Sequence, residues 1–209
     1  MERVFSKEKT DDWIVLEGID GTGKSTLAKL ATEQITIAYL ATGRTSYMHV
    51  LEEPSGTPEG RAIAGVIDEH EWCRTSSILF YGGLVLHTLL KTIHPATQKG
   101  ERVLSVRSFP STFAYQGVDA GHITIIADMY ADLIKWYPCP KIVLATCHPD
   151  TAIKRIEERD GRTVGKEEAD NLRHVNERYH DMAERFDWDI LDTNGSIEAA
   201  TETLVGMIT

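Results

Sequence analysis

Residues 18–25 carry the clearest chemical pattern in this sequence. They read GIDGTGKS, which fits the phosphate-binding pattern G-x-x-x-x-G-K-[ST] at every fixed position. Glycines let the backbone curl so that successive N–H groups point at phosphate oxygens. Lys24 adds a positive charge for the outer phosphates, and Ser25 offers a hydroxyl to Mg²⁺. The residues predicted to contact ATP are Gly18, Asp20, Gly21, Thr22, Gly23, Lys24, Ser25 and Thr26.

The elements on either side of this loop predict how it is positioned. The apolar run Trp13–Glu17 precedes it as a strand, and a helical period begins at Lys24. The positive end of that helix would face the same anion as the loop. A strand before the loop and a helix after it favour a phosphate site over a chance glycine turn. The motif alone predicts nucleotide binding, because GTPases, ATPases and kinases share it.

Strands and helices alternate along the rest of the chain. Further strands are predicted at residues 47–51, 103–106, 142–145 and 189–191. Helices are predicted at residues 58–68, 74–97, 123–136, 152–159 and 167–186, and after a cap at Ser196. This alternation, without repeats or a low-complexity linker, predicts an α/β fold with a five-stranded parallel sheet and helices on both faces. We expect a single domain over residues 1–209.

Composition narrows the class of partner and the compartment. Asp and Glu outnumber Lys and Arg by 32 to 22, and a net charge of −10 argues against a nucleic-acid polymer as partner. No stretch reaches the roughly 18 apolar residues that span a bilayer, and the N-terminus lacks a secretory pattern. Three widely spaced cysteines and scattered histidines argue against disulfides and zinc. We therefore expect a cytoplasmic protein that binds small nucleotides and no membrane.

Several segments resemble the thymidylate kinase family of P-loop nucleoside monophosphate kinases. They are WIVLEGIDGTGKST from residue 13, EEPSGTPEG from residue 52, RSFPSTFAYQG from residue 107 and RIEERDGR from residue 155. In this order around a P-loop they are specific, and the similarity runs from about residue 12 to 208. The resemblance implies transfer of the ATP γ-phosphate to dTMP, with Mg²⁺ as cofactor. It also implies a homodimer formed through the long helix at residues 74–97.

The resemblance also assigns an acceptor site. It implies that Asp20 holds the sugar 3′-hydroxyl and that Arg107 binds the acceptor phosphate. Arg74 would lie against the thymine ring, on which Phe80 would stack. Residues placed beside the acceptor by the same resemblance are Glu53, Pro54, Tyr115 and Gln116, and the loop at residues 192–194 would border adenine.

Residues 155–167 resemble the arginine-bearing lid of the family. Of its arginines, Arg162 follows Gly161 at the turn and is the one we expect to approach the transferred phosphate. The i,i+4 spacing of Arg155 and Arg159 on a charged helix is more typical of a solvated face. The residues predicted to take part in the transfer are therefore Lys24, Arg107, Arg162 and Glu53.

The sequence departs from the family pattern at the acceptor site. Val106 stands where the family has an aspartate before its arginine, Leu84 where it has an arginine in the long helix, and Glu52 where an arginine precedes Glu-Pro. These departures leave three alternatives open. The first is a deoxynucleoside kinase with Glu53 as general base. The second is a kinase of another or modified deoxynucleotide, and the third is a P-loop nucleotide-binding protein without kinase turnover.

Overall fold

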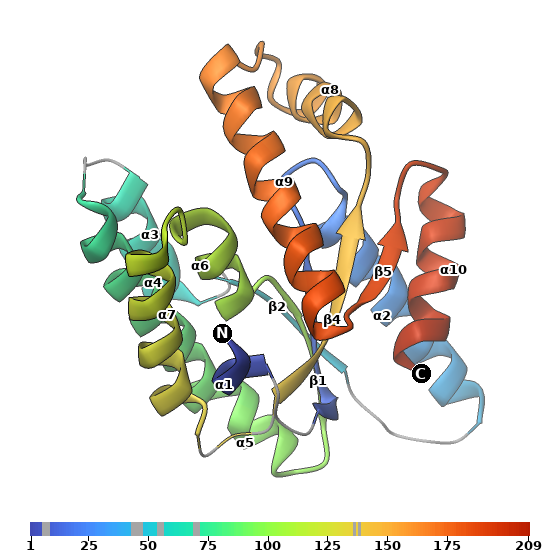
Figure 1. Ribbon diagram of the computed structural model, residues 1–209. Coiled ribbons are helices and arrows are strands. Elements are labelled where there is room, and N and C mark those ends of the chain that lie inside the picture. The colour runs from blue at the N-terminus through green and yellow to red at the C-terminus, as the bar shows by residue number, and fades with distance from the viewer. Residues whose placement is uncertain (6–8, 43–47, 54–56, 69–71, 136, 138) are drawn as a thin grey trace. The chain divides into compact units, whose positions relative to one another are not determined.

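The five strands form one sheet in the order β2-β3-β1-β4-β5. The computed structural model describes residues 1–5, 9–42, 48–53, 57–68, 72–135, 137 and 139–209 (Figure 1). Neighbouring strands pair in parallel where β2 meets β3 and where β4 meets β5. The predicted α/β class and the five predicted strands are thus confirmed. The chain divides into two compact units, Met1–Val15 with Ser46–Lys141 and Leu16–Thr45 with Ile142–Thr209.

The first unit holds most of β1 (Lys9–Glu17) together with β2 (Met48–Glu52) and β3 (Arg102–Val106). In the register of β2 and β3, Glu52 lies opposite Val106, so both strands end at the same level. Val103 and Leu104 are fully buried, as the apolar run predicted. The indole N–H of Trp13 donates to the Ser105 hydroxyl at 3.1 Å, which satisfies a buried polar group between β1 and β3.

Helices complete the first unit. They are α1 (Glu2–Phe5), α3 (Pro58–Asp68), α4 (Arg74–Thr88), η1 (Leu89–Ile93), α5 (His94–Thr97), α6 (Phe109–Gln116) and α7 (Ala120–Leu133). α4 packs against α6 and α7, and α1 packs against α7. The ring of Phe5 lies 5.5 Å from those of Phe109 and Phe113, and both also contact Tyr130. This aromatic cluster forms the core beneath α6.

The predicted long helix is present over Arg74–Thr97 as α4, η1 and α5. The π turn at η1 precedes Pro95, whose missing N–H prevents a regular α-helical hydrogen bond at that point. By length and composition alone, this helix could cross a membrane, although the sequence predicted no such span. Only 39% of its most apolar window is buried in the structure. A large part of its apolar surface is therefore exposed in the described part of the chain.

The second unit carries the phosphate-binding loop and the C-terminal part of the chain. Its elements are α2 (Lys24–Ala41), β4 (Cys139–Thr146), α8 (Pro149–Asp160), α9 (Lys166–Phe186), β5 (Asp189–Asp192) and α10 (Ile197–Ile208). α10 packs against α2 and β5, and α8 packs against α9 (Figure 1). The Ser196 hydroxyl accepts a hydrogen bond from the Ala199 N–H and confirms the predicted cap of α10.

Three features differ from the prediction, of which the first is α1 (Glu2–Phe5), where no helix was predicted. β1 begins at Lys9 rather than Trp13, because its first four residues are polar and mostly exposed and give no hydrophobic signal. α6 was not predicted, since a helix of eight residues offers little periodicity, although Pro110 in its first turn favours a helix start. Tyr47 and Trp136, at the ends of a predicted strand and a predicted helix, lie outside the described residues.

Candidate active site

The loop between β1 and α2 has the shape that its glycines predict. Gly18 adopts φ 139° and Gly21 φ 85°, both in the region that favours glycine. A Cβ at Gly18 would lie 2.2 Å from the Ala145 carbonyl oxygen, and one at Gly21 would lie 2.3 Å from that of Ala152. The loop therefore lies directly against the end of β4 and the first turn of α8. Any side chain at either glycine would separate these elements.

Lys24 holds its charge inside the loop. Its side chain is buried, and its ammonium group donates to the Ile19 carbonyl at 2.6 Å and to the Thr22 hydroxyl at 3.4 Å. The Thr22 hydroxyl in turn donates to the same carbonyl at 2.9 Å. A buried ammonium group needs such acceptors, and phosphate oxygens are stronger ones. The loop thus presents a held cation at the position that the motif reserves for phosphates.

Ser25 and Thr26 lie in the first turn of α2 and are exposed, and Asp20 is exposed within the loop. No group of three or more His, Cys, Asp or Glu side chains forms a metal-binding cluster in the described part of the chain. Mg²⁺ in nucleotide sites normally keeps several waters and is held by few protein oxygens plus phosphate. The exposed Ser25 hydroxyl and Asp20 carboxylate fit this manner of binding.

Arg155 lies at the phosphate loop rather than on a solvated face. Its guanidinium group donates to the Thr193 carbonyl at 2.8 Å and to the Gly21 carbonyl at 3.4 Å. Thr193 is buried, and its N–H donates to the Thr146 carbonyl at 2.8 Å. Arg155 therefore connects α8 with the loop at residues 192–194. The sequence signal for this placement is its position between Ala152 and Ile156, which are the two buried residues of α8.

Cys147, just after β4, interacts with Arg155, Thr193 and Lys24. The sequence analysis did not predict it as a residue near the phosphate loop. Burial raises the pKa of the Cys147 thiol, and the positive charges of Arg155 and Lys24 lower it by less. The thiol also hydrogen-bonds Thr193. It is thus a neutral, buried group beside the loop, without the reactivity of a thiolate.

A buried carboxylate lies immediately before the phosphate loop. Glu17 is fully buried and accepts a hydrogen bond of 2.8 Å from the Tyr179 hydroxyl on α9. The next residue of α9, His180, lies 2.9 Å from the Thr146 hydroxyl at the end of β4. Two polar contacts thus fasten α9 to the carboxyl ends of β1 and β4, which hold the loop.

The predicted acceptor residues of the first unit lie at the ends of β2 and β3. Arg107, directly after β3, has φ 68°, a conformation that is rare for a residue other than glycine. Its guanidinium group donates to the Ser111 hydroxyl at 3.1 Å and to the Tyr115 hydroxyl at 3.0 Å. It also lies 5.0 Å above the Tyr115 ring. Arg74, at the start of α4, donates to the Tyr115 carbonyl at 3.2 Å, so the structure brings three predicted residues together.

Other predicted acceptor residues are less closely grouped. Glu53 is buried directly after β2, and its N–H donates to the Val106 carbonyl at 2.9 Å. Gln116 is half-buried at the end of α6. Phe80 packs edge to face against Trp72, with ring centroids 4.9 Å apart, and does not join the hydrogen-bonded group around Tyr115. Pro54 lies outside the described residues.

Leu84 and Val106 are two of the positions at which the sequence departs from the family pattern. Both side chains are apolar and buried, and each is 4% exposed. Leu84 lies on α4, and Val106 ends β3 beside Glu53. At these positions the chain therefore contributes packing instead of charge. The charged residues that the sequence predicted for the acceptor site, Arg74, Arg107 and Glu53, stand at other positions.

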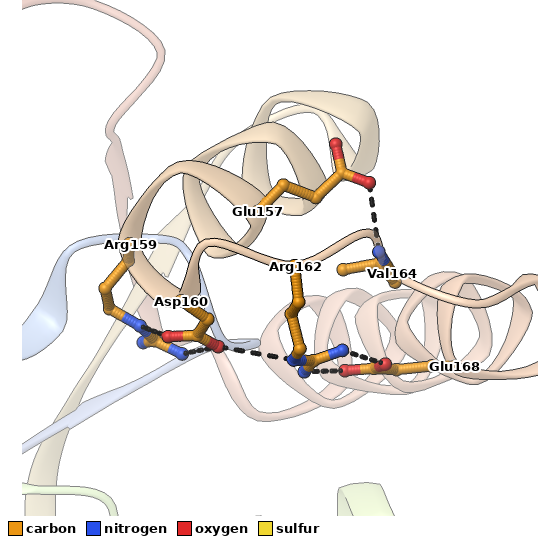
Figure 2. A network of polar contacts seen from close by, with 6 residues as sticks. All are labelled: Glu157, Arg159, Asp160, Arg162, Val164 and Glu168. Carbon is orange, nitrogen blue, oxygen red and sulfur yellow. Dashed lines mark hydrogen bonds and ion pairs between the residues drawn. The ribbon is translucent and has the colours of Figure 1, made fainter.

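The predicted lid, residues 155–167, is the end of α8, a turn, and the start of α9. Figure 2 shows that Arg159 is held by the carboxylate of Asp160 and Arg162 by that of Glu168 in the first turn of α9. Arg159 donates to both carboxylate oxygens of Asp160, at 2.6 and 3.0 Å, and Arg162 donates to both of Glu168, at 2.7 Å each. Glu157 accepts from the Val164 N–H at 3.0 Å, which closes the turn. The hydrogen bond from Arg162 lowers the pKa of Glu168, and that from Arg159 lowers the pKa of Asp160.

Comparison with known proteins points to one family. The thymidylate kinase family model matches residues 16–204. A probable thymidylate kinase of Methanosarcina acetivorans is 32% identical over 202 residues, which cover 93% of this chain and 94% of the relative. The thymidylate kinase of Ralstonia nicotianae is 31% identical over 167 residues, 78% of each chain.

A solved structure has the same fold. The crystal structure of thymidylate kinase from Ehrlichia chaffeensis matches with a TM-score of 0.72 at 20% identity, covering 95% of this chain and 98% of that chain. At this identity the match shows a shared fold. The family match over residues 16–204 includes the phosphate loop, the acceptor group and the lid. This chain belongs to the thymidylate kinase family.

Proposed function

We propose that this chain transfers the γ-phosphate of ATP to dTMP and thereby produces dTDP. The observation that carries the proposal is the complete phosphate loop, with the Lys24 ammonium group held inside it, in a chain of the thymidylate kinase family. The curated relatives above are named for the same activity, which supports dTMP as acceptor. The reaction class is transfer between two nucleotides.

The second unit would bind the donor. Backbone N–H groups of residues 18–26 surround the β- and γ-phosphates, and Lys24 exchanges its carbonyl partner for phosphate oxygens. The adenine would lie by the loop at residues 192–194. A magnesium ion, when bound, would neutralise phosphate charge, with the Ser25 hydroxyl as its protein ligand. These residues orient ATP and offset its charge before the transfer.

The first unit would bind the acceptor. Arg107 contacts the dTMP phosphate, and Arg74 lies against the base with Tyr115 and Gln116 at its border. Phe80, Glu53 and Pro54 are the remaining proposed acceptor contacts, and Asp20 holds the sugar 3′-hydroxyl. An acceptor phosphate is already an anionic nucleophile, so the transfer needs positioning and cations more than a general base. Arg162 of the lid would offset charge on the transferred group.

We further propose that the enzyme is a cytoplasmic homodimer. Exposed positions on α4 and η1, Leu79, Gly83 and Leu90, follow one another at helical spacing. Leu79 is 57% and Leu90 is 43% exposed, and a Cβ at Gly83 would meet nothing within 4 Å. An apolar stripe with a small residue in its middle lets two helices approach closely. This stripe is the proposed contact between the two copies.

The test is a transfer assay with ATP and Mg²⁺, in which dTMP, dUMP, other deoxynucleoside monophosphates and thymidine are offered in turn. We expect dTDP to form from dTMP. Lys24→Ala should lower kcat by about 10²- to 10³-fold, the effect of removing one charge-stabilising donor. Lys29→Ala, on the exposed face of the same helix, is the matched control and should keep its activity.

Other outcomes would identify the alternatives. Phosphorylation of thymidine but not dTMP would make the protein a nucleoside kinase, with Glu53 as the base. Preference for another deoxynucleotide would change the acceptor and keep the reaction class. Tight ATP binding without transfer to any acceptor would contradict the kinase proposal.

A further inference from the structure

Arg159 and Arg162 of the lid are paired with the carboxylates of Asp160 and Glu168. The ion pairs form a chain in which Arg159 binds Asp160, Asp160 lies 3.7 Å from Arg162, and Arg162 binds Glu168 (Figure 2). Two positive and two negative side chains cancel, so these four groups together offer no net charge to an anion. An arginine that is to contact phosphate must first leave its carboxylate.

The same network lies within the electric field of the phosphate loop. The pKa of Arg159 is raised chiefly by its hydrogen bond to Asp160, and the Asp20 carboxylate of the loop adds to this effect. Asp20 also acts on Asp160 and Glu168, whose pKa values its negative charge raises against the larger lowering by their arginines. The carboxylates of the lid and of the loop therefore repel one another, and they would repel ATP phosphates at the same place.

The position of Asp160 needs a local partner. It is the last residue of α8, where the negative end of the helix dipole disfavours an acid. Glu168, in contrast, lies in the first turn of α9, where an acid is favoured with or without Arg162. The helix dipole alone therefore explains why an acid stands at position 168 but not why one stands at position 160. Pairing with Arg159 and Arg162 accounts for both.

These ion pairs are weak enough for phosphate oxygens to replace the carboxylates as partners of the arginines. The side chains of Arg162 and Glu168 are 48% and 41% exposed, and ion pairs between exposed side chains contribute little to stability. Breaking a buried ion pair, in contrast, would be strongly destabilising. Phosphate offers arginine the same two-oxygen geometry with more charge. A phosphate chain in the loop can therefore replace the carboxylates without disrupting the fold.

We propose that Asp160 and Glu168 are resident counter-ions of the lid, which hold Arg159 and Arg162 until ATP phosphates displace them. The inference rests on the proposed function, because it takes ATP as the displacing ligand. Asp160 and Glu168 act as positioning residues, since they restrain the arginines in the nucleotide-free protein. They also weaken the binding of ATP, because each arginine must leave its carboxylate before it can contact phosphate.

The test measures the Kd for ATP by calorimetry at low salt, where surface charges act most strongly. Glu168→Gln should lower the Kd by about 2- to 5-fold, the range of an exposed ion pair. Asp160→Asn should shift the Kd in the same direction, because it frees Arg159 in the same way. Glu167→Gln, one residue earlier in the same turn, removes the same charge and should leave the Kd nearly unchanged.

A double-mutant cycle separates displacement from simple repulsion. In an Arg162→Ala background, Glu168→Gln should no longer lower the Kd, because there is no guanidinium group to release. A Kd that falls equally in both backgrounds, or equally with Glu167→Gln, would overturn the counter-ion role while the kinase function stands. A wild-type protein that binds no ATP would overturn both. Unchanged melting temperatures would show that the variants are folded.

Discussion

Tyr115 is the residue at which Arg74 and Arg107, the two arginines of the proposed acceptor site, meet. Its carbonyl accepts from Arg74, and its hydroxyl and ring face contact Arg107. Ser111 completes the restraint of Arg107, whose backbone is held at a positive φ. A guanidinium group with several partners occupies fewer rotamers, so less entropy is lost when it binds an anion. Tyr115 thus prepares both cations for an acceptor.

Tyr115→Phe tests this restraint. The variant keeps the ring and the backbone carbonyl but removes the hydroxyl partner of Arg107. We expect KM for dTMP to rise by about 3- to 10-fold, a partial loss of a hydrogen bond to a charged group. KM for ATP should not change. Tyr39→Phe on α2 is the control, and an equal rise in both KM values would contradict the assignment.

The cysteines give a prediction on pH dependence. Hydrogen bonds from Ser76 lower the pKa of the exposed Cys73 thiol, whereas burial raises the pKa of Cys147. The thiolate is the reactive form, so its fraction at a given pH is larger for Cys73. Iodoacetamide should therefore label Cys73 first, with a half-maximal rate below the pH of an ordinary thiol. Mass spectrometry across a pH series identifies the labelled residue, and earlier labelling of Cys147 would refute the prediction.

At the scale of elements, close packing around the phosphate loop holds its shape. α8 approaches the loop so closely that Gly21 has no room for a side chain, and Arg155 fastens the same helix to the Gly21 carbonyl. α9 is tied to the strand before the loop by Tyr179 and Glu17. The two helices that flank the lid turn are thus both anchored at the loop. Displacement of either helix would change the geometry of the phosphate site.

Gly21→Ala should destabilise the protein. The new Cβ would lie 2.3 Å from a backbone oxygen at φ 85°, so both sterics and backbone conformation oppose it. We expect a loss of about 2 kcal/mol or more in the free energy of unfolding, measured by urea denaturation. Gly206→Ala in α10, where a Cβ meets nothing within 4 Å, should instead stabilise by about 0.5–1 kcal/mol. Equal effects of the two substitutions would contradict the packing explanation.

At the scale of the whole molecule, the long helix Arg74–Thr97 carries part of the exposed apolar surface, at Leu79, Phe80 and Leu90. The window with mean hydropathy 1.3 between Arg74 and Thr97 is 39% buried. Surface of this kind is normally covered in a water-soluble protein. A second copy of the chain would cover it symmetrically, and the same residues would then contact each other across a two-fold axis.

Leu79→Arg combined with Leu90→Arg should produce a monomer. Four buried positive charges would meet across a two-fold contact and repel one another. Light scattering should show a mass near the 23.4 kDa of one chain instead of twice that value. Ile37→Arg on α2, where the side chain is 68% exposed, should leave the mass unchanged. A wild-type protein that is already monomeric would refute the proposed contact.

The order of most elements and the phosphate loop could be predicted from the amino-acid sequence alone. Both depend on local interactions: strand and helix follow from periodicity, and the loop follows from glycines and a lysine at fixed spacing. The bounds of α3 and of the helical stretch Arg74–Thr97 agree with the prediction for this reason. The eight residues of α6 were missed, because a short helix fixed by aromatic packing has little periodic signal.

Which charged side chains contact one another could not be predicted and is seen in the folded chain alone. Arg155 and Arg159 share one helix and an i,i+4 spacing, yet Arg155 reaches the phosphate loop and Arg159 pairs within the lid. Periodicity gives the angle of a residue on its helix but not the neighbour on that side. Arg107 and Tyr115 likewise meet because α6 turns back at the end of β3. Such contacts depend on how elements pack, which no local pattern encodes.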